Sequence, residues 1–125
     1  MPTYTRAAAT LPASDLGRAR KFYEETLGLQ LLEETPAGIF YQAGPHQLFL
    51  YESQYAGTNQ ATAATLEVSD LDAAVAELKD RGATFEEYEI PGVKTVNSIA
   101  ELGPYRSAWL KDTEGNIISI GNAGS

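Results

Sequence analysis

Two stretches of the chain carry apolar side chains at the spacing of a single helical face. The first lies within residues 15–27 and the second within 70–81, and both repeat at intervals of three and four residues. This periodicity predicts two amphipathic helices, each of which buries one face. The apolar positions are Leu16, Ala19, Phe22, Tyr23 and Leu27 in the first helix, and Leu71, Ala74, Val75 and Leu78 in the second.

The same short motif precedes both helices. Ser14-Asp15-Leu16 returns fifty-five residues later as Ser69-Asp70-Leu71, and each helix is followed by a glycine, Gly28 or Gly82. Ser and Asp accept hydrogen bonds from unpaired N–H groups at a helix N-terminus, and glycine adopts the left-handed conformation that ends many helices. The repeat therefore predicts one supersecondary unit used twice. The two units are expected at 1–56 and 57–125, within one domain of residues 1–125.

Shorter apolar and β-branched segments, bounded by turn residues, predict strands around each helix. The predicted order is a strand, a helix and three strands, given twice. Because one such unit is too small to close a core, we expect an α+β fold in which two βαβββ modules form a curved mixed sheet around a concave cavity, with the helices outside. The expected strands are residues 4–12, 29–34, 37–43 and 46–52, then 61–68, 83–89, 105–111 and 116–121.

Three segments lack a regular pattern. Residues 54–60 are polar and are expected to link the two units, and residues 122–125 are expected to fray. Residues 90–104 contain two prolines and two glycines and predict a long irregular loop. Loops of that length often act as lids, so Lys94 and Glu101 could contact a ligand; a surface excursion or a dimer arm is the alternative.

Composition narrows the class of protein. The chain is 43% hydrophobic and 21% charged with a net charge of −8, which is typical of a globular protein. It has no basic patch for nucleic acid, no apolar run long enough for a membrane span, and no pattern of a signal peptide. The absence of cysteine excludes disulfides and thiolate metal ligands. We therefore expect a cytoplasmic protein with no nucleic-acid or membrane partner.

Two motifs resemble those of a known superfamily. They are Asp15-Leu16 through Phe22-Tyr23 to Leu27-Gly28-Leu29, and Trp109-Leu110-Lys111-Asp112-Thr113-Glu114-Gly115-Asn116. Both are similar to motifs of the vicinal oxygen chelate superfamily, which includes glyoxalase I, extradiol dioxygenases, fosfomycin-resistance enzymes and bleomycin-resistance proteins. The usual closing motif is Phe-x-Asp-Pro-x-Gly-Asn, from which Leu110 and Thr113 depart. The resemblance covers nearly the whole chain and implies the doubled fold, but a fold does not fix an activity.

The resemblance also implies where a metal would be held. Enzymes of this superfamily hold a divalent metal with His, Glu or Gln side chains on the inner face of the sheet. The matching positions here are Ala8, Ala63, Ser119, and Phe49 or Tyr51. None of these side chains is a ligand for Zn, Ni, Fe or Mn, and the single histidine, His46, cannot form such a site alone. We therefore expect no metal and no cofactor.

Strand alternation predicts which side chains line the cavity. If Leu48, Leu50, Ala108 and Leu110 face the helices, their neighbours face inward, and Phe49 and Tyr51 should approach Trp109. The expected ligand-binding residues are Tyr41, Phe49, Tyr51, Glu67, Tyr105 and Trp109. Aromatic walls suit planar or cationic ligands, although the same rings could fill a core or cover a dimer contact.

Three functions are compatible with these residues. The first is a metal-free binding protein of the bleomycin-resistance kind that holds a small aromatic or cationic molecule. The second is a metal-independent lyase or isomerase that uses Glu67 or a tyrosine hydroxyl, and the third is an interaction role. Glu67 is the candidate catalytic residue, although pairing with Arg6 is its simplest role. We favour binding over catalysis, and expect a homodimer because half-open sheets leave strand edges and aromatic side chains to cover.

Overall fold

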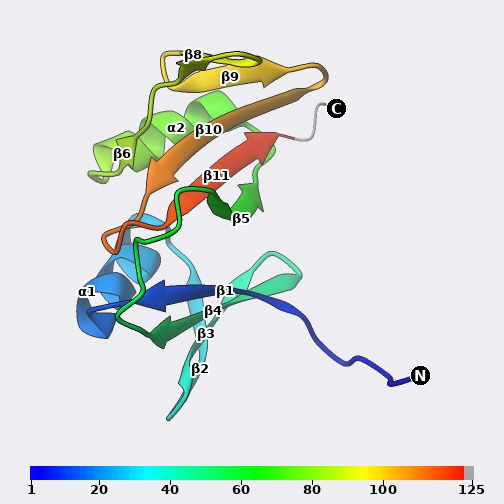
Figure 1. Ribbon diagram of the computed structural model, residues 1–125, viewed down its shortest axis with the longest axis vertical. Helices are drawn as coiled ribbons and strands as arrows, with labels where there is room; N and C mark the ends of the chain where they lie inside the picture. The colour runs from blue at the N-terminus through cyan, green and yellow to red at the C-terminus, as the bar shows by residue number, and fades with distance from the viewer. Residues whose placement is uncertain (123–125) are drawn as a thin grey trace.

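The computed structural model describes residues 1–122 and contains two β-sheets, each with one helix against it (Figure 1). The first sheet has the strand order β1-β4-β3-β2 and the second the order β5-β11-β10-β9-β8-β7. In both sheets the strand before the helix pairs in parallel with the last strand, and the hairpin neighbours are antiparallel. This arrangement confirms the predicted α+β fold class.

The elements follow the predicted order closely in the first half of the chain. They are β1 (Ala8–Ala13), α1 (Leu16–Lys21), a π-helical turn (Phe22–Thr26), β2 (Gln30–Thr35), β3 (Gly38–Ala43) and β4 (His46–Glu52). The second half contains more strands than expected. They surround α2 (Leu71–Asp80) and are β5 (Thr62–Glu67), β6 (Thr84–Phe85), β7 (Glu89–Ile90), β8 (Val93–Val96), β9 (Ile99–Leu102), β10 (Tyr105–Lys111) and β11 (Ile117–Asn122).

Both helices begin at the aspartate of the repeated motif. The side chain of Asp15 accepts a hydrogen bond from the backbone N–H of Arg18 at 3.0 Å, and that of Asp70 accepts one from Ala73 at 3.1 Å. Each aspartate therefore satisfies an N–H group that the first helical turn leaves unpaired. The motif has the same structural role in both halves, as its repetition predicts. Neither helix of the described chain is long and apolar enough to cross a lipid bilayer.

One apolar core joins the two sheets and the two helices. Within the strands, every second side chain points into this core: Leu48 and Leu50 are 1% and 0% exposed, and Ala108 and Leu110 are both fully buried. This alternation confirms the predicted helix-facing positions. The intervening side chains lie on the opposite surface of each sheet, which we call its open face.

The prediction of an irregular loop at residues 90–104 is wrong. The segment forms β7, β8 and β9, which extend the second sheet beyond β10 (Figure 1). Strands β8 and β9 meet at a two-residue turn, Asn97-Ser98, in which both residues have positive φ angles of 53° and 75°. The predicted strand 83–89 is correspondingly short, because β6 ends at Phe85. Of the predicted frayed tail, Asn122 belongs to β11 and residues 123–125 lie outside the described residues.

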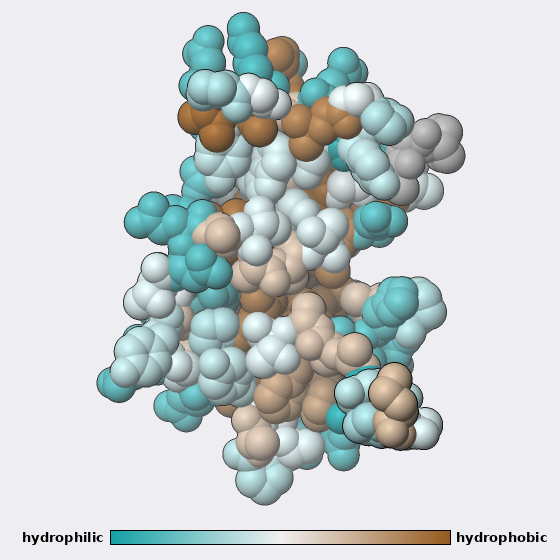
Figure 2. All heavy atoms as spheres, turned by 45° about the vertical axis from the view of Figure 1, so that its right-hand side comes forward, coloured by the Kyte–Doolittle hydropathy of each residue, from teal (hydrophilic) through white to brown (hydrophobic). Residues whose placement is uncertain are grey.

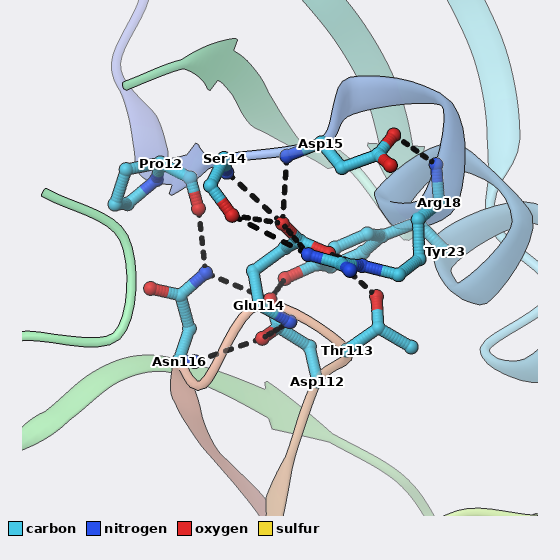
Figure 3. Close-up of polar contacts among 9 residues, drawn as sticks. All are labelled: Pro12, Ser14, Asp15, Arg18, Tyr23, Asp112, Thr113, Glu114 and Asn116. Atoms are coloured by element: carbon cyan, nitrogen blue, oxygen red, sulfur yellow. Dashed lines mark hydrogen bonds and ion pairs between the residues drawn. The ribbon is translucent and has the colours of Figure 1, made fainter. Parts of the chain in front are cut away.

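The turn between β10 and β11 binds the start of α1 (Figure 3). The side chain of Glu114 is fully buried, and its carboxylate accepts hydrogen bonds from the backbone N–H groups of Ser14 and Asp15, both at 2.9 Å. Arg18 donates to the same carboxylate through Nε at 2.7 Å and Nη2 at 3.1 Å. Burial alone would raise the pKa of Glu114, but the hydrogen bonds from Arg18 and the Asp15 N–H lower it to about 2. A charged Glu114 thus connects the two halves.

Asp112 and Asn116 complete this contact, and we call residues 112–116 the closing turn. The Tyr23 hydroxyl donates to Asp112 at 2.5 Å, and the Asn116 side-chain amide donates to Asp112 and to the carbonyl of Pro12, both at 2.8 Å. Burial, and then the charge of Asp112, raise the pKa of Tyr23, which keeps the hydroxyl protonated as a donor. The Asp and Asn of the closing motif therefore fix the second half against the first.

Candidate functional site

Three aromatic rings lie on the open face of the first sheet, and we call them the first aromatic cluster. They are Phe40 of β3 with Phe49 and Tyr51 of β4, and all three are half-buried. The ring centroids of Phe40 and Phe49 are 4.5 Å apart, and those of Phe49 and Tyr51 are 6.3 Å apart with planes within 5°. The guanidinium carbon of Arg6 lies 3.9 Å from the centroid of Phe40. These partly exposed rings form a flat apolar surface that can pack against a planar molecule.

The position of Phe49 depends on a glycine in the neighbouring strand. Gly38 opens β3, and a Cβ atom added there would lie 2.6 Å from Cζ of the Phe49 ring. The same Cβ would lie 2.4 Å from the carbonyl oxygen of Leu50, so a larger residue at this position would displace the backbone of β4 as well as the ring. The alternation with the buried Leu48 and Leu50 then directs Phe49 to the open face.

The open face of the second sheet carries Tyr88 and Trp109, which we call the second aromatic cluster. Their ring centroids are 5.4 Å apart with planes at 79°, an edge-to-face contact. Trp109 lies opposite Ser119 in the β10–β11 pair, and the Ser119 hydroxyl donates to Oγ1 of Thr65 at 2.8 Å. Burial, and then the nearby charge of Glu86, raise the pKa of Tyr88. The cluster therefore combines an apolar ring surface with a pair of hydroxyl groups.

Tyr88 is the functional candidate that the sequence pattern does not single out. A regular strand over 83–89 gives it no special position. In the structure β6 ends at Phe85, and the chain between β6 and β7 brings Tyr88 onto the edge of Trp109. No local sequence signal marks this departure from a regular strand.

Tyr41 was expected in the cavity and lies instead in the core. It is fully buried, its ring stacks on Tyr23 at 6.1 Å, and its hydroxyl donates to Glu24 at 2.8 Å. The reason is the register of the β3–β4 hairpin, which pairs Tyr41 with the helix-facing Leu48. Burial, and then the contact with Glu24, raise the pKa of Tyr41.

Glu67 and Arg6 do not form the expected ion pair. Arg6 donates instead to the side-chain oxygen of Gln47 at 3.1 Å. Glu67 is exposed and lines a groove of about 1020 Å³ between the two sheets, together with the Glu77–Arg81 ion pair. Figure 2 shows apolar residues gathered in the middle of one side of the molecule, and the groove's apolar lining includes Leu27, Leu29, Leu66, Val68 and Leu78.

The other predicted site residues divide between the two sheets. Phe49 and Tyr51 contact each other on the first sheet, and Trp109 lies on the second. Over residues 1–122, the ring contacts remain within each half of the chain, so the structure does not bring Trp109 against Phe49 or Tyr51. Tyr105 is 51% exposed at the start of β10.

The structure places Lys94 and Glu101 away from the aromatic clusters. Both residues line a second groove, of about 910 Å³, that lies against Val75 and Lys79 of α2. This groove is on the helix side of the second sheet, whereas Trp109 faces the open side. Pairing of β9 with β10 fixes this orientation, because it places Glu101 opposite Arg106.

The residues at the superfamily's metal-ligand positions do not fit a metal. Ala8 lies in β1, Ala63 in β5 and Ser119 in β11, and neither a methyl group nor a lone hydroxyl is a ligand set for a transition metal. His46 is exposed at the turn that begins β4. Within the described residues, no group of three or more His, Asp or Glu side chains is arranged to hold a metal ion.

Comparison with known families accounts for the doubled fold. A family described as the Glyoxalase/Bleomycin resistance protein/Dioxygenase superfamily matches residues 5–120. The chain belongs to this superfamily. The match spans both sheets, both helices and the closing turn, so the membership covers all of the architecture that positions the two aromatic clusters. A search of curated protein sequences finds no match.

Several solved structures share this fold. A glyoxalase/bleomycin resistance protein/dioxygenase from Alicyclobacillus acidocaldarius has 20% identity and a TM-score of 0.70, covering 94% of this chain and 90% of that chain. A lactoylglutathione lyase from Agrobacterium tumefaciens has 22% identity and a TM-score of 0.65, covering 99% and 97%. TnmS3, an antibiotic binding protein from Streptomyces sp. CB03234, has 22% identity and a TM-score of 0.66, covering 98% of each chain. At these identities the similarity shows the fold alone.

Proposed function

We propose that this superfamily member binds a small, largely planar organic molecule at its aromatic clusters, without a resident metal. The observation that carries the proposal is the pair of half-buried aromatic clusters on the open faces of the two sheets. At the superfamily's ligand positions, Ala8, Ala63 and Ser119 are small and supply no metal ligand set. Small side chains beside exposed rings leave room for an organic ligand.

The structural neighbours support binding as one use of this fold. TnmS3 is an antibiotic binding protein, and the neighbour from Agrobacterium tumefaciens is a lyase, so the fold serves both classes. A metal-independent lyase or isomerase, or an interaction role, is the alternative for this chain. Catalysis would need a base at the reacting atom, and Glu67 lines the groove between the sheets as an exposed residue. This position favours binding over catalysis.

We also propose that the chain forms a homodimer in the cytoplasm. Strand β2 is the outer strand of the first sheet, and its Leu31 and Leu32 are 37% and 43% exposed. Val96, in the hairpin at the outer side of the second sheet, is 64% exposed. A second copy would cover apolar side chains and an unpaired strand edge at the same time. Light scattering of the purified chain measures this directly.

Fluorescence of Trp109, the only tryptophan, tests the proposed binding. The probe is 1-naphthalenemethanol, a neutral planar molecule, with emission corrected for its absorbance. We expect the probe to change the wild-type emission, and calorimetry to show weaker binding to Trp109→Ala. Because Trp109 is half-buried, Trp109→Ala should cost less stability than the roughly 3–5 kcal/mol of a core truncation.

The control is Tyr55→Ala, which removes a ring that is 70% exposed in the segment between the two sheets and should leave probe binding unchanged. A Trp109→Ala variant that loses the full stability of a core position, together with wild-type emission that no planar probe alters, would show that Trp109 fills a core and binds nothing.

A further inference from the structure

Arg6 differs from every other arginine of the chain. Arg18, Arg20, Arg81 and Arg106 each form an ion pair with a carboxylate, at N–O distances of 3.0 Å or less. Across the described residues, Arg6 has no carboxylate within 4.0 Å, and its hydrogen bond is to the neutral side chain of Gln47. Among the arginines of a chain with 17 acidic and 9 basic residues, Arg6 therefore keeps its charge without an acidic partner.

This unpaired cation is held at the first aromatic cluster. Its guanidinium group lies over the face of Phe40, and Gln47 of β4 fixes one of its nitrogens, Nη1. A guanidinium has five N–H donors in a rigid plane, so most of them remain available to an acceptor. Phe49 and Tyr51 continue the ring surface next to Phe40. A flat apolar surface and a positive charge with free donors are therefore adjacent.

We infer that the first aromatic cluster binds a planar aromatic anion, with the ring on the Phe40–Phe49–Tyr51 surface and a carboxylate or similar oxyanion on Arg6. Arg binds planar oxyanions with two parallel hydrogen bonds, which a lysine or a neutral donor cannot reproduce. The inference rests on the proposed function and specifies the charge of its ligand. It replaces the cationic ligand that aromatic walls alone would also suit.

The other charge on this face is Glu33. It lies in β2 opposite Phe40, it is exposed, and within residues 1–122 it forms no ion pair with Arg6. Its carboxylate would repel an anion on the cluster and attract a cation. The guanidinium carbon of Arg6 lies 3.9 Å from the Phe40 centroid, so its positive charge acts directly at the stacking surface. Replacing Glu33 by glutamine therefore removes a negative charge from the same face, as the matched counterpart of removing the positive charge of Arg6.

Three probes with the same naphthalene ring and different charges distinguish the contribution of ligand charge to affinity from that of ring packing. They are anionic 1-naphthoate, neutral 1-naphthalenemethanol and cationic 1-naphthylmethylammonium. Their dissociation constants are measured by isothermal titration calorimetry at low salt on the wild-type chain, Arg6→Gln and Glu33→Gln. We expect wild type to bind 1-naphthoate most tightly. Arg6→Gln should weaken 1-naphthoate about tenfold or more, as for loss of a charge-assisted hydrogen bond, with little change for 1-naphthalenemethanol. Glu33→Gln should leave 1-naphthoate binding unchanged or strengthen it.

The outcomes separate the inference from the proposed function. Binding of all three probes with equal affinity, tighter binding of the cation, or an Arg6→Gln variant that binds 1-naphthoate as wild type does would overturn the inference and leave planar binding intact. Failure of all three probes to bind a folded wild-type chain would contradict the proposed function itself. Circular dichroism and thermal unfolding test whether both variants are folded. We expect them to be, because Arg6 and Glu33 are both exposed.

Discussion

At the residue scale, Glu114 explains how the two halves of the chain are fixed to each other. A carboxylate buried without partners would be strongly destabilising. Here two backbone N–H groups and Arg18 satisfy it, so the cost of desolvation is offset by charge-assisted hydrogen bonds. Through Glu114, the closing turn therefore connects the second sheet to the first helix (Figure 3).

Glu114→Gln is expected to lower the free energy of unfolding by about 2–3 kcal/mol at neutral pH, in line with the lowering of its pKa to about 2. The folded pKa lies below that of an unfolded glutamate, about 4.3. The stabilisation is therefore complete above the unfolded pKa and disappears as the pH falls through the folded pKa. Urea unfolding at several pH values should show wild type and variant converging between about pH 4 and pH 2.

Asp72→Asn is the matched control for this measurement. Asp72 pairs with Arg106 at the surface, where water and salt screen the interaction, so the variant should unfold nearly as wild type does. If Glu114→Gln were as stable as Asp72→Asn at neutral pH, the account of the closing turn would be wrong.

Residue-level features were predictable only where a local pattern determines them. The caps at Asp15 and Asp70 follow from short-range spacing, and the structure confirms both. The side of the sheet occupied by Tyr41 depends on hairpin register, which the two-residue turn between Ala43 and His46 determines. Counting pairs outward from that turn places Tyr41 opposite Leu48, so the signal was present in the sequence. The contacts of Glu114 join residues about a hundred positions apart and have no local signal.

At the element scale, the β8–β9 hairpin is the largest departure from the sequence pattern. Its turn, Asn97-Ser98, lacks the glycine that normally marks a tight turn with positive φ. Glu87 stabilises the turn instead. Its carboxylate accepts hydrogen bonds from the Ser98 N–H at 3.1 Å and from the Ser98 hydroxyl at 2.9 Å. The hairpin therefore depends on a residue outside itself, which periodicity within 90–104 cannot reveal.

Glu87→Ala is expected to destabilise this hairpin by about 1–2 kcal/mol, the effect of removing hydrogen bonds to a charged group. Amide hydrogen exchange should accelerate for residues 93–102 and remain unchanged in the first sheet. The control is Glu89→Ala, since Glu89 is an exposed residue of β7. Equal exchange rates in wild type and Glu87→Ala would show that the hairpin forms without Glu87.

At the scale of the whole molecule, the doubled architecture was predictable because the repeated helix start and strand order specify it. The fold class is confirmed by the two sheets and by the superfamily match over residues 5–120. The arrangement of the site was less predictable. Alternation places Phe49, Tyr51 and Trp109 on open faces, but it contains no information on how two sheets are oriented in space. Tyr88 and Arg6 fall within the predicted strands 83–89 and 4–12, but in the structure both lie outside the strands, where alternation does not determine their side-chain positions.

The residues at the ligand positions predict the metal content of the purified chain. Elemental analysis after dialysis should give well under one transition metal per chain, because Ala8, Ala63 and Ser119 supply no ligand set. Replacing Ala8 and Ala63 by histidine should raise the retained zinc or nickel relative to wild type. A stoichiometric metal in the wild-type chain would require a ligand set elsewhere and would contradict the proposed metal-free binding.

The most direct test of the central claim is the location of a bound planar molecule. Side-chain resonances of the aromatic and leucine residues can be followed by NMR while 1-naphthoate is added to the wild-type chain. The account predicts shifts at both aromatic clusters, at Phe40, Phe49 and Tyr51 and at Trp109, with the largest shifts in the first cluster because Arg6 favours the anion there. Shifts confined to Leu27, Leu29, Leu66 and Leu78 would place the ligand in the groove between the sheets and contradict the account, and so would the absence of any shift at millimolar probe.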